Sequence, residues 1–162
     1  MVTITVGNDV AVRSPKHSFF MRAARDRMQG QWDATGGVWR FPLALEQEVR
    51  ELCRKYYGTD GADGATLGAV TITAAAQIAK CCNAVFFCNR EIARACDRDG
   101  GARVGPDVAH LSGQITSGGS MKYWETIIES GAKFKVLNFP MAWLTEQKKR
   151  WDDAVWIVDA PN

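Results

Sequence analysis

The sequence lacks any long run of apolar residues. A membrane-spanning helix needs roughly 20 consecutive apolar residues, and no stretch of the chain approaches that length. The first residues, Met1–Val6, alternate like a strand and have neither the basic start nor the long apolar centre of a signal peptide. We therefore expect a cytoplasmic protein with no membrane partner.

A strong excess of charge of one sign is also missing. The 162 residues include 20 Lys and Arg against 18 Asp and Glu, which leaves a formal net charge of +2. Proteins that bind nucleic acid through massed positive charge need a much larger excess. Any nucleic-acid binding by this chain must therefore depend on a local basic patch.

Patterns typical of metal sites are scarce. The chain has two histidines and five cysteines, with no Cys-x-x-Cys pair and no histidine at zinc-finger spacing. The odd number of cysteines and the missing signal peptide favour reduced thiols buried in the core. The cysteines are Cys53, Cys81, Cys82, Cys88 and Cys96. We expect no metal and no cofactor.

Recognisable catalytic motifs are absent too. The two histidines, His17 and His110, lie in different halves of the chain. No nucleophile elbow, His-Glu-x-x-His motif or carboxylate pair at a recognisable spacing occurs. The sequence therefore favours a protein that is not an enzyme and acts by binding.

What the chain does contain is a clear internal boundary. Residues 58–65 hold three glycines and two aspartates, and they include no large apolar residue. Such a composition is typical of a turn or a short linker. We predict a first part over residues 1–57 and a second, β-rich part over residues 66–162.

The first part opens with a hairpin and a helix. Apolar residues alternate over residues 2–12 on both sides of a Gly-Asn-Asp turn, which predicts two paired strands. Ser14 and Pro15 resemble an N-cap followed by a proline in the first helical turn. Apolar residues then recur at helical spacing until Gly30, which is the expected stop.

A second hairpin and a second helix complete the first part. Two runs with aromatic residues flank a glycine turn over residues 31–42, which predicts the hairpin. Apolar residues at helical spacing over residues 45–56 predict a helix that ends at Gly58. The predicted order of elements in this N-terminal module is ββαββα.

Short apolar runs separated by turn residues fill the second part. Many short strands at this spacing predict a small antiparallel β barrel or sandwich. Met141, Leu144 and Lys148 lie on a helical line and add one C-terminal helix, so the predicted fold class is α+β. The expected strands are Thr66–Ala74, Ala84–Cys88, Glu91–Ala95, Val108–Leu111, Lys122–Ile128, Lys133–Phe139 and Ala154–Val158.

The predicted second hairpin carries the most informative residues. Trp32 and Trp39 lie on strands paired across a tight turn, and Asp33 opens that turn. Aromatic pairs across strands stabilise such hairpins by packing alone. An exposed tryptophan could instead stack on a nucleic-acid base. Both interpretations stay open from the sequence.

A pattern in this stretch resembles a known family. Residues 31–43 read x-Trp-Asp-x-x-x-x-x-Trp-x-Phe-Pro-Leu between two predicted helices, which resembles the HARP domain of annealing helicases over residues 10–57. The resemblance implies a DNA-binding module, and it implies nothing about ATP because the chain has no helicase motor.

A wider resemblance covers most of the chain. The first part is similar to Gly-x-Trp-Asp…Trp modules of uncharacterised proteins from bacterial plasmids and phages. Three motifs of the second part are similar to stretches of the same family: Asn-Arg-x-Ile-Ala-Arg, Arg-Asp-x-Gly-Ala-Arg and Ser-Gly-Gly-Ser-x-Lys. This resemblance implies a mobile genetic element but no assigned activity.

Basic residues are concentrated in the first part. Residues 1–57 contain nine Lys and Arg against six Asp and Glu, a local +3, whereas the remainder has eleven against twelve, a local −1. Phosphate contacts by such residues give affinity without sequence readout. A charged helix face that is only solvated is the alternative. The predicted nucleic-acid-binding residues are Arg22, Arg25, Arg40, Arg54 and Lys55 for phosphate, with Trp32 and Trp39 for stacking or packing.

Two glycine loops in the second part are weaker candidates for anion binding. Successive backbone N–H groups in such loops can form an anion nest. Neither loop matches a P-loop, and glycines in ordinary hairpin turns are the alternative. The candidate residues are Arg98, Arg103, Ser117, Gly118, Gly119, Ser120 and Lys122.

Two main hypotheses about function follow from these residues, besides capture of a nucleotide or small anion by the glycine loops. The first is a non-catalytic DNA-binding protein of a mobile genetic element, which contacts the DNA backbone through a basic helix face and an aromatic hairpin. The second is an anti-defence, anti-CRISPR-like inhibitor encoded by a phage or plasmid, which binds a host defence protein. Aromatic and arginine residues also anchor protein interfaces, so composition does not separate the two. A homo-oligomer also stays open.

Overall fold

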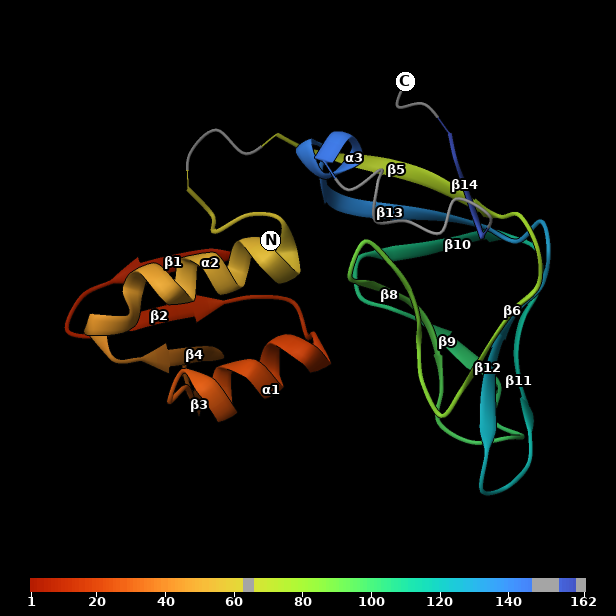
Figure 1. The fold of residues 1–162 in the computed structure, drawn as a ribbon, viewed down its shortest axis with the longest axis horizontal. Helices are drawn as coiled ribbons and strands as arrows, with labels where there is room; N and C mark the ends of the chain where they lie inside the picture. Colours follow the sequence, from red (N-terminus) through yellow and green to blue (C-terminus); the bar gives the residue numbers. More distant parts are fainter. Residues whose placement is uncertain (63–65, 147–154, 160–162) are drawn as a thin grey trace. The chain divides into compact units, whose positions relative to one another are not determined.

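The computed structural model describes residues 1–62, 66–146 and 155–159 of the protein. The chain divides into two compact units, unit 1 over Met1–Thr66 and unit 2 over Leu67–Asn162. Helices and antiparallel strands occur together, so the fold is mixed α+β, as predicted (Figure 1). Among the described residues, no helix is long and apolar enough to cross a membrane.

Unit 1 is a four-stranded antiparallel sheet with two α-helices. The strands lie in the order β1-β2-β4-β3. The elements along the chain are β1 (Thr3–Val6), β2 (Val10–Arg13), α1 (Ser18–Arg27), β3 (Gln31–Asp33), β4 (Val38–Phe41), the short 3-10 helix η1 (Leu43–Leu45) and α2 (Glu46–Tyr57).

Strand alternation divides the sheet of unit 1 into two different faces. Val10 pairs with Phe41 and Val12 with Trp39, so these four side chains share one face. They form a core with residues of both helices. The opposite face carries exposed polar residues, among them Thr3, Thr5, Arg13 and Arg40, beside the half-buried Ala11 and Val38. The helices therefore cover the apolar face.

Helix α1 begins later than Ser14 and Pro15 predict. It starts at Ser18, and the N-cap is His17, whose Nδ1 accepts a hydrogen bond from the Phe20 N–H at 3.3 Å. The Tyr57 hydroxyl, from the end of α2, donates to the Pro15 carbonyl at 2.9 Å. A contact between distant parts of the chain thus holds Pro15 outside the helix and overrides the local signal.

Gly30 follows the end of α1, but its backbone is not in the left-handed conformation that often requires glycine at this place. The residue with positive φ is Gln29, at 53°. The Gly30 N–H donates to the Ala24 carbonyl, and a Cβ atom at position 30 would lie 2.6 Å from the Phe41 ring. Space, rather than dihedral freedom, therefore requires glycine here. At the end of α2, by contrast, Gly58 has a φ of 72°.

Unit 2 consists of three small antiparallel sheets, in the orders β10-β13-β5-β14, β11-β12-β6 and β7-β8-β9. Its strands are β5 (Leu67–Ala74), β6 (Ile78–Cys81), β7 (Val85–Phe87), β8 (Arg90–Ala95), β9 (Ala102–Val104), β10 (Val108–Ser112), β11 (Ile115–Gly119), β12 (Trp124–Ile128), β13 (Lys133–Pro140) and β14 (Trp156–Val158). Their buried residues form one core, which includes Ile72, Ile92, Ile128, Phe134 and Phe139.

The predicted barrel is not formed, because within the described residues none of the sheets closes on itself. A barrel needs one continuous ladder of hydrogen bonds around all strands. Here the pairing of β13 with β5 shifts between Val136 and Phe139, and Asn138 in between has a φ of 49°. The helix predicted after Pro140 is present as α3 (Ala142–Glu146), and Lys148 lies outside the described residues.

Candidate nucleic-acid interface

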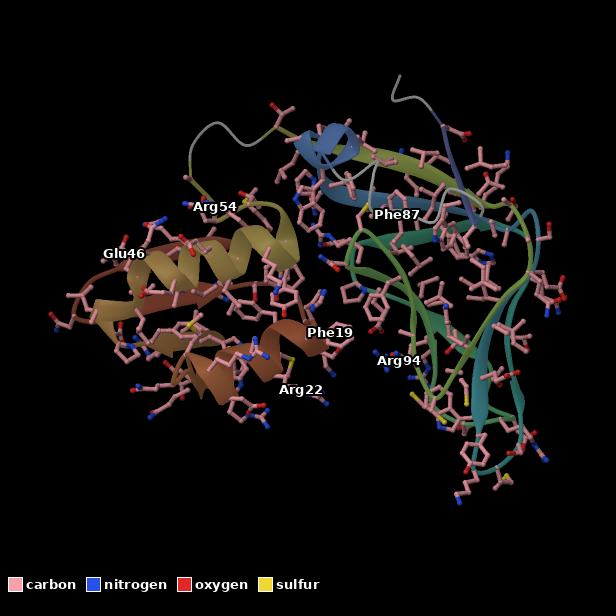
Figure 2. The ribbon with its side chains drawn as sticks, viewed as in Figure 1. Phe19, Arg22, Glu46, Arg54, Phe87 and Arg94 are labelled. Carbon is pink, nitrogen blue, oxygen red and sulfur yellow. The ribbon has the colours of Figure 1, made fainter. Side chains whose placement is uncertain are left out.

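The outer side of α1 brings two of the predicted phosphate ligands together. The helix buries Phe20, Ala23 and Ala24, whereas Arg22 and Arg25 are exposed. Residues three apart are neighbours on a helix surface. Phe19, which is not among the predicted binding residues, is exposed on the same helix (Figure 2). We call Phe19, Arg22 and Arg25 the α1 outer face.

The two arginines of the α1 outer face have no ion pair within the part of the chain that the structure describes. Asp26 and Arg27 are exposed on the same helix, so its last two turns keep a net positive charge. Arg25 and Arg27 also lie in the last turn, where the helix dipole stabilises cations. The positive charge of these arginines is thus available to a ligand. It also stabilises the helix through the helix dipole.

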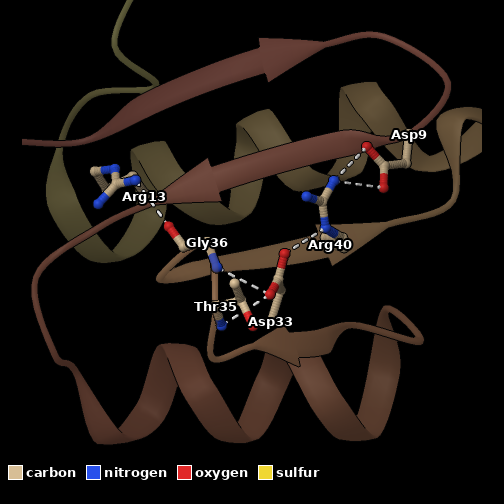
Figure 3. Close-up of polar contacts among 6 residues, drawn as sticks. All are labelled: Asp9, Arg13, Asp33, Thr35, Gly36 and Arg40. Atoms are coloured by element: carbon tan, nitrogen blue, oxygen red, sulfur yellow. Dashed lines mark hydrogen bonds and ion pairs between the residues drawn. The ribbon is translucent and has the colours of Figure 1, made fainter.

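Arg40 is engaged on the polar face of the sheet. Its Nε donates to Asp33 at 2.9 Å, and its Nη1 donates to Asp9 at 3.0 Å (Figure 3). Hydrogen bonds from the Gly36 N–H and from Arg40 lower the pKa of Asp33. Arg13 on this face donates to the Gly36 carbonyl at 2.8 Å. Two carboxylates already balance Arg40, so the structure gives it little capacity for phosphate.

Arg54 is engaged at the end of α2. It donates to Asp60 at 2.7 Å, and Arg50 lies 3.6 Å from the same carboxylate. Burial alone raises the pKa of Asp60, but hydrogen bonds from the Ala62 N–H and Arg54 outweigh it and hold that pKa below its usual value. The neighbouring Lys55 lies with its Nζ 5.5 Å from the centre of the Tyr56 ring.

The two tryptophans of the β3–β4 hairpin have different environments. Their ring centres are 5.7 Å apart, and the rings are tilted by 55°. Trp39 is 6% exposed and belongs to the core, whereas Trp32 is 54% exposed. The Asp33 carboxylate accepts hydrogen bonds from the N–H groups of Thr35 and Gly36 and so fixes the turn. Of these two tryptophans, Trp32 is the one whose ring is accessible.

The structure brings the two glycine loops of unit 2 together. The Ser117 hydroxyl accepts from the Gly101 N–H at 2.9 Å and donates to the Arg98 carbonyl at 2.7 Å. However, the Asp97 carboxylate already accepts hydrogen bonds from the N–H groups of Asp99 and Gly100. A carboxylate of the chain itself therefore occupies the donors that an anion nest would use.

The remaining residues of the predicted anion site belong to strands and a turn. Gly118 and Gly119 pair with Glu125 and Trp124 in the β11–β12 ladder. Ser120 and Tyr123 close the turn through their backbone groups. The other two members are Arg103, exposed on β9, and Lys122, whose Nζ lies 5.3 Å from the centre of the Tyr123 ring. This geometry favours the interpretation as ordinary turns.

The predicted phosphate-binding arginines thus fall into two groups. Arg40 and Arg54 are paired with carboxylates of the chain, whereas Arg22 and Arg25 have no ion pair in the described residues. The sequence indicated part of this division. Asp33 and Arg40 flank one short hairpin, so their proximity could have been anticipated. The partners Asp9 and Asp60 gave no such signal. No group of three His, Cys, Asp or Glu side chains forms a metal site within the described residues.

Comparison of the chain with models of protein families, with curated proteins and with solved structures finds no match.

Proposed function

We propose that unit 1 is a non-catalytic DNA-binding module that contacts the DNA backbone through the α1 outer face. Arg22 and Arg25 would bind phosphates, and Trp32 would stack on a base of a single-stranded or unpaired segment. Stacking of a base on an aromatic ring contributes about 1–3 kcal/mol. The module would hold DNA without reading its sequence, because phosphate contacts carry no sequence information.

The observation that carries this proposal is the difference between the cations of unit 1. Arg22 and Arg25 are exposed without an ion pair in the described residues, whereas Arg40 and Arg54 each contact carboxylates. An arginine that gives up a carboxylate to bind a phosphate exchanges one ion pair for another and gains little. An arginine without an ion pair releases counterions from the DNA when it binds a phosphate, and the whole of this release contributes to affinity.

The resemblance stated from the sequence points in the same direction. A HARP-like ββαββα module in unit 1 would give the Trp-Asp…Trp-x-Phe-Pro segment its place beside the basic helix. The proposal includes a source in a mobile genetic element, a cytoplasmic location and a sandwich arrangement for unit 2.

The test is fluorescence anisotropy with labelled single-stranded, duplex and forked DNA at two salt concentrations. We compare the parent with R22A/R25A and with K133A/K135A, which removes the same charge from exposed positions of β13. We expect R22A/R25A to bind more weakly and to reduce the salt slope by about 1.4–1.8, the value for two lost phosphate contacts. K133A/K135A should bind like the parent.

Two outcomes contradict the proposal. If R22A/R25A binds DNA as tightly as the parent, the α1 outer face is not the interface. If both double variants weaken binding equally, net charge alone governs the interaction and no site exists.

A second candidate function rests on the end of the β11–β12 hairpin in unit 2. Met121 and Tyr123 are 77% and 57% exposed there. Methionine and tyrosine are enriched at protein interfaces. These side chains favour binding to a protein, such as a host defence complex. A pull-down from host cells that M121S/Y123S abolishes and R22A/R25A leaves intact would support this function over DNA binding.

A further inference from the structure

Two adjacent cysteines lie at the surface of unit 2. Cys81 is the last residue of β6, Cys82 follows it directly, and both are exposed. Their Sγ atoms are 3.8 Å apart, with the thiol of Cys81 directed at the sulfur of Cys82. The exposure of Cys81 and Cys82 therefore contradicts the prediction from the sequence that the cysteines are buried in the core.

The backbone holds the two thiols in this arrangement. Cys81 pairs with Glu125 of β12, and the Cys82 N–H donates to the Trp124 carbonyl at 2.8 Å. Cys82 has a φ of 49°, a left-handed conformation that is uncommon for a residue with a Cβ atom. The pairing with β12 therefore enforces the local backbone that sets the two thiols side by side.

The other cysteines show what a purely structural thiol looks like in this chain. Cys53 and Cys88 are buried. Burial raises the pKa of Cys53 to about 12 and raises that of Cys88 as well, so neither forms a thiolate at neutral pH. Cys96 is exposed and is the remaining accessible thiol. Only Cys81 and Cys82 combine exposure with a second thiol at contact distance.

We propose that Cys81 and Cys82 form a redox-active dithiol, which a low-molecular-weight disulfide converts into an intrachain disulfide. In the first step, one cysteine thiolate attacks the small disulfide, forms a mixed disulfide and releases one small thiol. In the second step, the neighbouring cysteine attacks the mixed disulfide and releases the second small thiol. The two cysteines lose two electrons and two protons, and the small disulfide gains both.

The geometry also determines how stable the product is. Bond formation brings the two sulfurs to about 2.05 Å. Adjacent Cα atoms across a trans peptide are about 3.8 Å apart, which is shorter than the roughly 4.4–6.8 Å usual for a disulfide. The bridge is therefore strained, and strained, exposed disulfides are the ones that thiols reduce readily. The pair suits reversible oxidation rather than a permanent structural link.

The first experiment uses the full chain and oxidised glutathione as the probe, with mass spectrometry of the intact protein. The background variant is C96S, which removes the third exposed thiol. We expect C96S to lose the mass of two hydrogen atoms without gaining glutathione, and to return to its starting mass with dithiothreitol. In the same background, C82S and C81S should each retain one glutathione, because the resolving thiol is missing.

The position of the bridge is then mapped by fragmentation of the tryptic peptide from Cys81 to Arg90, which also contains Cys88. A bridge between Cys81 and Cys82 leaves fragment ions between Asn83 and Phe87 at their normal masses, whereas a bridge to Cys88 does not. A bridge to Cys88 or Cys53, or glutathione retained on both Cys81 and Cys82, overturns the proposal.

A second probe requires no variant and so does not depend on the folding of any substitution. Phenylarsine oxide binds two neighbouring thiols through two As–S bonds with release of water. We expect the native parent to retain one equivalent in excess monothiol and to lose it to a dithiol. Loss of the arsenical to monothiol alone shows that the two thiols do not act together and overturns the proposal.

Discussion

The end of α2 and the outer side of α1 carry similar basic residues but use them differently. On α2, Arg50 and Arg54 share the buried carboxylate of Asp60. On α1, Arg22 and Arg25 have no such partner in the described residues. The tryptophans of the hairpin repeat this contrast, since Trp39 is buried and Trp32 is exposed. Residues engaged inside unit 1 should support its stability, and residues left at its surface should support binding.

The tryptophan pair gives the largest expected effect. W39A removes a core ring and should reduce the free energy of unfolding by about 3–5 kcal/mol. W32A removes a half-exposed ring and should cost less than about 1 kcal/mol, while it weakens binding to single-stranded DNA. Hydrogen exchange of peptides from β4 and α2 in urea measures the stability of unit 1 separately from that of unit 2. A large loss from W32A together with a small loss from W39A would reverse the assignment of the two rings.

Removal of the shared carboxylate tests the contrast between the helices directly. D60N leaves Arg50 and Arg54 without their common partner and should destabilise unit 1 by about 1–3 kcal/mol. It also frees positive charge near the end of α2, so DNA binding should become tighter and steeper in salt. Anisotropy on folded protein checks this. Unchanged binding would show that pairing with Asp60 does not limit the availability of Arg54.

Acid should affect the same carboxylate. The pKa of Asp60 is lowered in the folded chain, so its contribution to stability is present above its unfolded value of about 3.9 and is lost as the pH falls through the folded value. We expect the stability of unit 1 to decline below about pH 4, and to decline less in D60N. Urea midpoints of the parent and D60N at neutral and acidic pH, read by hydrogen exchange, compare the two slopes. Equal slopes would contradict a role for Asp60.

The α1 outer face gives the smallest expected change in stability. R22A/R25A removes no ion pair in the described residues and should change the free energy of unfolding by no more than about 0.5 kcal/mol. Its circular dichroism spectrum and urea midpoint should therefore match those of the parent. A clear loss of stability would show that these arginines support the helix, for instance through its dipole.

Local patterns were sufficient to predict the strands and α-helices of unit 1, apart from the start of α1. Alternation over residues 2–12 and the helical spacing over residues 45–56 correspond to β1, β2 and α2. The start of α1 could not be predicted, because it depends on a hydrogen bond between Tyr57 and Pro15, 42 residues apart. The second carboxylate partner of Arg40 is similarly distant, because Asp9 and Arg40 are 31 residues apart.

Unit 2 was harder to predict, because long-range pairing defines several of its strands. Ile115–Gly119 contains turn-forming residues, yet it forms β11 through its ladder with β12. Ile78–Cys81 has little strand pattern of its own and becomes β6 because Ile78 pairs with Ile128. The exposure of Cys81 and Cys82 could not be predicted for the same reason, because it depends on the pairing of β6 with β12.

The lack of space around Gly30 limits which residues can replace it during evolution. The absence of a side chain there lets the end of α1 lie directly against the Phe41 ring, and Trp32 follows two positions later. Even alanine would push the helix and the hairpin apart and so displace the half-exposed tryptophan from its setting. Substitution of the buried Gly30 would thus alter the surface around Trp32. Among descendants that keep the aromatic surface, position 30 should tolerate fewer replacements than either arginine of α1.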